Sequence, residues 1–520
     1  MMSEQLSISD ANKWEFVNGD WTEEGDGILK PPANARADDG QGMQGVRFAF
    51  YKEKAYRDVH VRFKIRHTGA HQDAGLILRA RDANHFYLLH FPDCGQQSRA
   101  QHFWAVLSRM DDSGYLRHVK MAMVNRVASH PQGSHDIEAS FVNDQLNVRI
   151  DGKGIFPASD TTYIGPGCIG LMSFGNVSLA DVQIEGRAEN NPWRDGVRQR
   201  KNWFYPCTEK GWASPQEFVR PSNGELMLYF TVQGKPLIIR SSDNGHTWSE
   251  PEEVGYSGRL WQRPDGTLVM VLKNENQFTL RATKDDGRTW SEPVPMKVGP
   301  TPRGMKGLHL GPQGFLNLRG GSALMLLYGA HESTSDNFPI YTWGAHHCQA
   351  YACRSTDNGL TWTEPVNIDN RGVDQNGKQI EGNLDLTEVC ATQIGNGRVF
   401  ALIRPIYSPW MWETWSDDGG LTWGPCVRGA FPGYATPNML RTASGAILVA
   451  HRMPSLTIHC SLDDGMTFDQ GTMIDSGLWC MGSMIEVEPD FVLYAYMDSF
   501  ESLMRAQFIR ITAMGLEPLD

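Results

Sequence analysis

One short segment places a carboxylate and a guanidinium at the two ends of a strand-turn-strand pattern. In "TEVCATQIGNGRVFALIR", Glu388 precedes one apolar run and Arg404 follows the next, with "IGNGR" as the turn between them. Because a hairpin brings its second strand back to the level where the first began, we expect these two side chains to lie together. Such a pair would hold an anionic substrate group beside a carboxylate that serves in proton transfer or as a charge partner. The pattern alone fits a plain surface salt bridge equally well.

Other titratable and charged residues occur where further predicted strands begin or end. Histidine titrates near neutral pH, so His309, His331 and the adjacent Glu332 are candidates for acid-base work together with Glu388. Most of the sixteen histidines are nevertheless expected to be structural or solvated. The charged residues predicted to bind substrate are Glu217, Arg259, Lys273, Arg404 and Arg452.

Tryptophans supply candidate surfaces for stacking on sugar rings. Trp410 and Trp412 occur in "IYSPWMWE", a predicted loop beside Arg404, and Trp479 lies in the last part of the chain. Aromatic rings present large apolar faces that suit the faces of sugars. Most of the sixteen tryptophans must instead pack inside the fold, and the pattern does not separate the two groups.

A turn repeated five times indicates which elements position these residues. The copies are "SSDNGHTW", "TKDDGRTW", "STDNGLTW", "SDDGGLTW" and "SLDDGMTF". Within such a turn the aspartate caps backbone N–H groups, the glycine adopts a backbone angle that other residues resist, and the tryptophan packs between sheets. The aspartates lie about 40 to 70 residues apart, which is the length of one four-stranded propeller blade with variable loops. The motif is therefore interpreted as structural, and it lacks the ligand spacing of a calcium loop.

The geometry of a four-stranded meander separates the two faces of such a propeller. The turn between the third and fourth strands lies at the opposite end from the start of the first strand and the end of the second. The repeated turns should therefore mark the back of the disc. The candidate residues above should gather at the front, around the central channel.

The first part of the chain follows a different pattern. In "VHVRFKI", Val59, Val61, Phe63 and Ile65 alternate with polar residues, and "DIEASF" and "LNVRIDG" repeat this alternation around "VNDQ". These runs predict antiparallel strands in a two-sheet sandwich over residues 1–190. The polar stretch 185–203 predicts the domain boundary, and residues 200–520 should form the propeller.

Charge and cysteine content limit the classes of partner. A net charge of −12 disfavours a nucleic-acid partner, and the longest apolar run is too short to span a bilayer. Nine scattered cysteines without a CxxC pair indicate free thiols rather than a disulfide framework or a metal site. We therefore expect a cytoplasmic protein without cofactor, metal, nucleic acid or membrane, and an oligomer is compatible with the sequence. No basic and apolar export signal opens the chain.

The five SxDxGxT[WF] copies resemble the Asp-box, or BNR, repeats of the sialidase-like six-bladed propellers, over roughly residues 203–515. The first 190 residues resemble the concanavalin-like or LamG-type jelly rolls on the strand pattern and "AGLILRARDANHFYLLHF". The resemblance implies an all-β fold, with a jelly roll followed by six blades, the sixth without a repeated turn. It also implies that Glu388 assists a nucleophile and that Arg404 and Arg452 grip a sugar carboxylate.

The sequence departs from the family at three positions. The first arginine of the family's triad has no match in "WASPQEFVRP", and its acid/base aspartate is missing from "TVQGKP". Met481 stands where the nucleophilic tyrosine is expected, at a position predicted to contact substrate. A retaining sialidase uses that tyrosine to attack an anionic sugar, so the ordinary mechanism is not expected here.

These observations predict an exo-acting glycoside hydrolase that removes a terminal acidic sugar, such as a sialic or uronic acid, from an oligosaccharide. One alternative is a lyase on a uronic-acid glycan, in which the arginines neutralise the carboxylate and a histidine abstracts the neighbouring proton. The other is a propeller that binds glycan without catalysis.

Overall fold

The computed structural model describes residues 2–31, 41–43, 45–67, 72–97, 100–125, 134–175, 177–274, 277–331, 348–368, 386–405, 410–433, 435–476, 482–498 and 502–519. The chain divides into two compact units. Unit 1 comprises Met1–Asn202, Pro454–Thr457 and Gln470–Leu478, and unit 2 comprises Trp203–Met453, Ile458–Asp469 and Trp479–Asp520. The secondary structure described in both is built from strands, with two 3-10 turns, η1 (Ala11–Lys13) and η2 (Gly25–Gly27).

Unit 1 is an antiparallel β structure organised around one long strand, β5 (Val46–His67), which pairs with β2, β11, β14 and β15. Its other strands are β1 (Met2–Gln5), β2 (Trp14–Val17), β3 (Thr22–Glu24), β4 (Ile28–Lys30), β6 (Asp73–Asp82), β7 (His85–His90), β8 (Asp93–Gln97), β9 (Ala100–Met110), β10 (Leu116–Asn125), β11 (Ser134–Val142), β12 (Gln145–Ile150), β13 (Lys153–Ser159), β14 (Gly167–Phe174), β15 (Val177–Glu189) and β36 (Thr472–Asp475). The jelly-roll connectivity remains a prediction.

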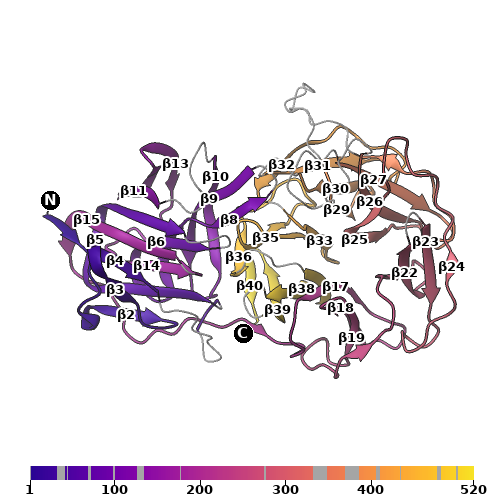
Figure 1. Cartoon of the computed structure of the whole chain (residues 1–520), viewed down its shortest axis with the longest axis horizontal. Helices are drawn as coiled ribbons and strands as arrows, with labels where there is room; N and C mark the ends of the chain where they lie inside the picture. Colours follow the sequence, from indigo (N-terminus) through magenta and orange to yellow (C-terminus); the bar gives the residue numbers. More distant parts are fainter. Residues whose placement is uncertain are drawn as a thin grey trace. The chain divides into compact units, whose positions relative to one another are not determined.

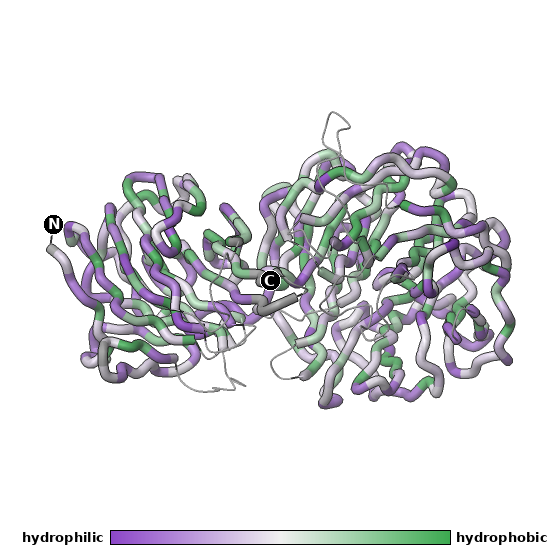
Figure 2. The backbone as a smooth tube through the Cα atoms, turned by 45° about the horizontal axis from the view of Figure 1, so that its top comes forward, coloured by the Kyte–Doolittle hydropathy of each residue, from purple (hydrophilic) through white to green (hydrophobic). Residues whose placement is uncertain are grey.

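The alternation predicted for unit 1 is present in β5. Val59, Val61, Phe63 and Ile65 are buried in its core, and the polar residues between them are exposed. The predicted hairpin is β11 paired with β12, with Val142 opposite Gln145 and a two-residue turn between them. Figure 2 shows hydrophobic residues along the strands and hydrophilic ones in many of the turns. Side-chain alternation is thus enough to predict these strands.

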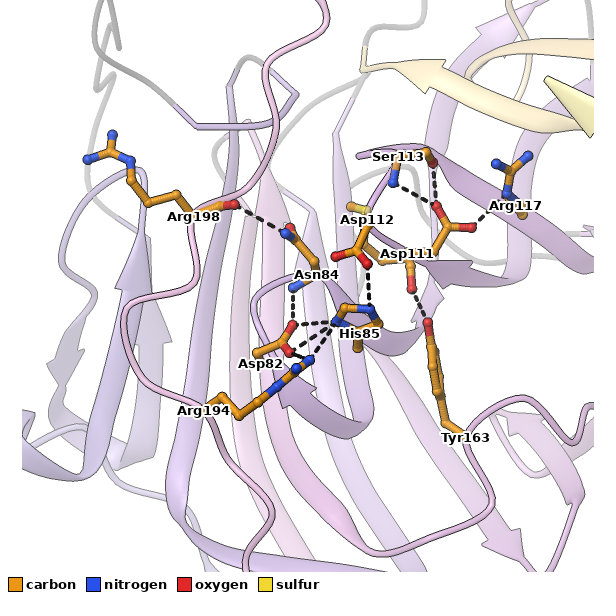
Figure 3. A network of polar contacts seen from close by, with 11 residues as sticks. Asp82, Asn84, His85, Asp111, Asp112, Ser113, Arg117, Tyr163, Arg194 and Arg198 are labelled. Atoms are coloured by element: carbon orange, nitrogen blue, oxygen red, sulfur yellow. Dashed lines mark hydrogen bonds and ion pairs between the residues drawn. The ribbon is translucent and has the colours of Figure 1, made fainter. Parts of the chain in front are cut away.

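The polar segment after β15 is fixed to unit 1 by hydrogen bonds (Figure 3). The Arg194 guanidinium contacts the buried Asp82 carboxylate, which also accepts from His85 Nδ1 at 2.8 Å. Asn84 Nδ2 donates to the carbonyl of Arg198 at 3.1 Å, and Gln199 Nε2 donates to the carbonyl of Ala83 at 2.8 Å. Residues 190–202 show no regular spacing of apolar side chains. Hydrogen bonds and an ion pair, rather than a buried apolar face, hold this segment in place.

Unit 2 contains five separate antiparallel sheets. They consist of β17 (Ala213–Val219), β18 (Leu226–Val232), β19 (Lys235–Ser241) and β20 (Glu252–Glu253); β21 (Arg259–Gln262), β22 (Leu268–Asn274), β23 (Gln277–Ala282) and β24 (Val294–Pro295); β25 (His309–Asn317), β26 (Ala323–Ala330), β27 (Cys348–Ser355) and β28 (Val366–Asn367); β29 (Val389–Gln393), β30 (Val399–Ile403), β31 (Trp410–Ser416) and β32 (Val427–Pro432); and β37 (Gly482–Glu488), β38 (Phe491–Asp498), β39 (Leu503–Thr512), β40 (Gly515–Pro518) and β16 (Trp203–Phe204).

These sheets form a β-propeller, with β17, β25 and β29 toward its centre (Figure 1). The strand β17 contacts β21 and β37, and β25 contacts β29. The strands β33 (Asn438–Arg441) and β34 (Ile447–His451) pair with each other, and β33 contacts both β29 and β37. The strand β35 (Leu456–Ser461) follows them along the chain, and the sheet topology does not set these strands apart as a sheet of their own. Five separate blades are therefore described, and the six-blade count is not established.

The five repeated turns share one hydrogen-bond pattern, as the sequence predicts. In the first copy, Ser241 Oγ donates to Asp243 Oδ1 at 2.7 Å, and Thr247 N and Oγ1 donate to the same carboxylate at 2.8 and 2.6 Å. The equivalent threonine bonds occur at Asp285, Asp357, Asp418 and Asp463. These bonds, with that of Thr247 Oγ1 the strongest, lower the pKa of Asp243 to about 2.

The composition of the repeat follows from its backbone. The residue after each aspartate has a positive φ, and it is Asn, Asp, Asn, Gly or Asp in the five copies. These residue types tolerate the left-handed region best. Trp362 of the third copy packs in a core shared by the second and third sheets. The repeated turns therefore perform a structural role.

Candidate active site

Glu388 and Arg404 form a buried ion pair where β29 begins and β30 ends. The backbone N–H of Arg404 donates to the carbonyl of Glu388 at 2.8 Å, which extends the hairpin by one residue pair. Arg404 Nη1 donates to Glu388 Oε2 at 2.8 Å, and their side chains are 14% and 7% exposed. The pair is therefore not a plain surface salt bridge. Removing either charge would leave the other one poorly solvated and without a counter-charge.

Arg452 is joined to this pair through a threonine that the sequence did not single out. Thr436 N donates to Glu388 Oε2 at 2.9 Å, and Arg452 Nε donates to Thr436 Oγ1 at 3.1 Å. Arg452 follows β34 directly and is 5% exposed. Hydrogen bonds therefore connect Glu388, Arg404 and Arg452, with Thr436 as the link. We call Glu388, Arg404, Thr436 and Arg452 the paired cluster.

The turn that carries Thr436 is strained. Ala435 and Thr436 have φ angles of 79° and 49°, in the region that favours glycine. Two consecutive non-glycine residues in that region are costly and occur mainly where function fixes the backbone. The sequence signal for Thr436 is weak: it stands two residues before β33, much as Glu388 stands one residue before β29.

His309 lies beside Lys273 rather than in an acid-base pair. Lys273 Nζ lies 3.3 Å from His309 Nδ1, at the start of β25. Burial, and secondarily the Lys273 charge, lower the pKa of His309 to about 4, and burial also lowers the pKa of Lys273. The prediction that His309 titrates near neutral pH is therefore wrong, because desolvation favours the neutral imidazole. At neutral pH it accepts a hydrogen bond from the ammonium group.

His331 lies where the second strand of the third sheet ends. His331 follows β26 and forms an isolated bridge with Met305. Its ring lies against Gly304, where an added Cβ would come within 2.9 Å of Nε2. Glu332 lies outside the described residues, as do Trp479 and Met481.

A cavity of about 420 Å³ is lined by inner strands of unit 2. Glu217 reaches it from β17, and Gln313 reaches it from an irregular part of β25, where Gln313 Oε1 accepts from Ala391 N at 2.6 Å. Burial raises the pKa of Glu217 to about 8, against the opposing effect of Arg259. The Arg259 guanidinium donates to the carbonyl of Gly311 at 3.3 Å. The loss of solvent thus favours the uncharged form of Glu217.

The two tryptophans of β31 differ in exposure. Trp412 is completely buried in the core between the third and fourth sheets, so its ring has no face for a sugar and the predicted contact is wrong. The alternation of β31 places it among apolar neighbours rather than in a loop. Trp410 is partly exposed, and the Arg428 guanidinium lies 5.2 Å from its ring centre.

No group of three metal-ligating side chains occurs among the described residues. Seven described cysteines carry free, buried thiols: Cys168, Cys207, Cys348, Cys353, Cys390, Cys426 and Cys460. Within the described ranges, no helix has the length and apolar character needed to cross a membrane.

No family model and no curated protein matches this chain. Among solved structures it is similar to the Hadza microbial sialidase Hz136, with a TM-score of 0.45 and 14% identity over 88% of this chain and 94% of that one. It is also similar to the NanB sialidase from Streptococcus pneumoniae, with a TM-score of 0.27 and 11% identity over 89% and 87% of the two chains. A third similarity is to the carbohydrate binding module CBM66 from Bacillus subtilis, with a TM-score of 0.27 and 14% identity over 34% of this chain and 96% of that one. At such low TM-scores the site must be interpreted from its own residues.

Proposed function

We propose that this protein is an exo-acting glycoside hydrolase that removes a terminal acidic sugar from an oligosaccharide. The observation that carries the proposal is the paired cluster, in which a carboxylate holds the half-buried Arg404 and a hydroxyl accepts from the buried Arg452. A buried guanidinium binds a carboxylate through short, charge-assisted hydrogen bonds. The chain has a net charge of −12, so this local cationic site is the exception on an acidic protein.

The pairing of Glu388 leaves one of its oxygens for substrate. Both hydrogen bonds that described residues make to its carboxylate fall on Oε2. Oε1 can therefore face a reacting group, as a charge partner for the developing positive sugar or as a proton acceptor. The neighbouring Arg404 holds the carboxylate in position through the hydrogen bond to Oε2.

The same proposal includes the finer features of the fold. We propose that β33, β34 and β35 supply the blade that brings the count to six, because β33 contacts both β29 and β37, the first strands of the sheets on either side. The five turns are then the Asp boxes of a sialidase-like propeller, and unit 1 is a jelly roll. A lyase is less well supported, because the low pKa of His309 makes it a poor base for abstracting a proton beside a carboxylate.

A panel of fluorogenic glycosides tests this function. Sialic acid and uronic acid glycosides should release the fluorophore, whereas matched neutral glycosides should be far poorer substrates. Arg404→Ala should abolish that preference. Arg398→Ala is the matched control, because Arg398 lies at the turn end of the same hairpin and pairs with Asp417. Unsaturated product absorbing in the ultraviolet would indicate the lyase, and acidic-sugar binding without turnover would indicate a lectin.

A further inference from the structure

Two buried histidines pair at the end of the strand that leads to Arg452. His451 is the last residue of β34, and His459 lies on β35. Their Nε2 atoms are 3.0 Å apart, and the two residues are 1% and 0% exposed. Two N–H groups that face each other repel, so one of these nitrogens must donate and the other must accept. The contact therefore depends on which tautomer each ring adopts.

The tautomer of His459 is set by the backbone of Asp469. His459 Nδ1 lies 3.1 Å from the carbonyl oxygen of Asp469, and a carbonyl can only accept, so Nδ1 carries the hydrogen. Burial favours the neutral ring: it lowers the pKa of His459 to about 3, against the opposing effect of this hydrogen bond. In the neutral ring Nε2 is then the acceptor, and His451 Nε2 is the donor. Hydrogen bonds thus run in one direction, from His451 to His459 to the Asp469 carbonyl.

The His451 ring fills the space beside the turn that carries Thr436. A Cβ added to Gly433 would come within 2.4 Å of His451 Cε1, so any larger residue there would displace the ring. At the end of β32, the Phe431 ring stacks on His459 with 3.6 Å between the ring centres and 12° between the planes. The two imidazoles and the phenylalanine therefore pack as one unit, and the backbone at Gly433 rests on it.

Arg452 lies at the other end of this contact. Its N–H donates to the carbonyl of Ala435 at 3.4 Å, and its Nε donates to Thr436 Oγ1 at 3.1 Å. Both bonds require the end of β34 to keep its distance from the turn. The His451 ring determines that distance, because it extends from the end of β34 to Gly433.

We propose that the hydrogen bond from His451 to His459 positions Arg452 for the carboxylate of an acidic sugar. The bond holds the His451 ring against Gly433, and the ring keeps Arg452 in place beside Thr436. This inference rests on the proposed function. His451 and His459 are positioning residues, because they act through Arg452. Loss of the bond should therefore weaken the binding of acidic sugars and leave neutral ones unaffected.

Three variants of His459 separate the hydrogen bond from packing. His459→Phe keeps a ring that stacks on Phe431 but has no nitrogen, and His459→Asn keeps a donor for the Asp469 carbonyl but has no group at the position of Nε2. Both should raise KM for the best acidic glycoside roughly tenfold, with kcat within about twofold of wild type, because a displaced binding group loses its alignment. His459→Gln places an amide oxygen near the position of Nε2, where it can accept from His451, so it should restore KM.

A control variant and a neutral glycoside separate positioning from stability. His246→Phe is the matched control, because His246 also stacks on a phenylalanine, Phe508, with 4.6 Å between ring centres, but lies in the first repeated turn. It should leave KM unchanged. A fold that is merely weakened would lower kcat/KM for acidic and neutral glycosides alike, and thermal melting measures that loss. Unchanged KM in His459→Phe and His459→Asn, an equal loss for neutral glycosides, or no recovery in His459→Gln would overturn the proposal.

Two measurements do not depend on turnover. Nitrogen NMR of the wild-type histidine rings should show the hydrogen on Nδ1 of His459 and on Nε2 of His451, and the opposite pattern would contradict the proposal. Calorimetric titration with free sialic acid and free glucuronic acid measures binding directly. If wild type cleaves no glycoside, the proposed hydrolase function fails on its own. Affinity lost in His459→Phe and kept in His459→Gln would still support the positioning role, whereas equal affinity in both, or binding of neither acid, would contradict it.

Discussion

Glu388 and Arg404, which we call the charged side, form an ion pair where β29 begins and β30 ends, whereas burial displaces Glu217, His309 and Lys273, which we call the neutral side, toward their uncharged forms. Glu388 and Arg404 are almost fully buried, yet each faces an opposite charge at 2.8 Å. On the other side, burial raises the pKa of Glu217 and lowers the pKa of both His309 and Lys273. The same loss of solvent thus has opposite consequences, depending on whether a partner is supplied. One side can bind charge, and the other can donate or accept hydrogen bonds.

Removing a guanidinium from the charged side should have the largest effect. Arg404→Ala or Arg452→Ala should cost about 2–4 kcal/mol in transition-state binding of an acidic glycoside, because a buried charge-assisted contact is lost. Steady-state kcat/KM measures this loss, and thermal melting checks that the variants fold. Arg404→Lys keeps the charge and should lose less. Wild-type kcat/KM in both alanine variants would disprove the site.

Neutralising the carboxylate of the charged side should act on turnover. Glu388→Gln retains the shape of the side chain and the contact from Thr436 N but removes the charge, so kcat should fall roughly 100-fold with little change in KM. Single-turnover kinetics separate this loss from product release. A rise in KM at unchanged kcat would instead show that Glu388 only positions the arginines.

Removing the hydroxyl of Thr436, which links the two arginines, should have an intermediate effect on kcat/KM. Thr436→Val removes the hydroxyl that accepts from Arg452 Nε but keeps the backbone amide that serves Glu388, so it should cost about 1 kcal/mol in kcat/KM. Thr436→Ser keeps the hydroxyl and should behave as wild type. Equal losses in both variants would point to the strained turn rather than to the hydroxyl.

The smallest effect is expected from a substitution on the neutral side, and it concerns the pKa of His309. Lys273→Met removes the ammonium group beside His309 Nδ1, so the pKa of His309 should rise from about 4. Because burial is the larger cause of the shift, the pKa should remain below its ordinary value. NMR titration of the histidine ring measures this directly. A return to the ordinary value would show that charge, and not burial, sets the protonation state.

Some of the site could be predicted because it depends on local register. The pairing of Glu388 with Arg404 follows from one hairpin that spans a sequence separation of 16, and Arg452 follows from the same pattern in the next hairpin. Thr436 could not be predicted in this way, since its contacts depend on a turn with unusual backbone angles. Trp412 was misassigned for a related reason: alternation reveals the two faces of a strand but not which of them another sheet covers.

The sequence by itself determined the repeated turns, the hairpins and the alternating strands of unit 1, because hydrogen bonds between neighbours and side-chain direction fix them within a few residues. Only the tertiary structure decided which of the polar residues are charged. Glu217 and His309 carry no sequence mark of their shifted pKa values, since the burial that causes those shifts comes from strands distant in the chain. The loss of water around an ionisable group belongs to the assembled propeller, and no single segment of the chain contains it.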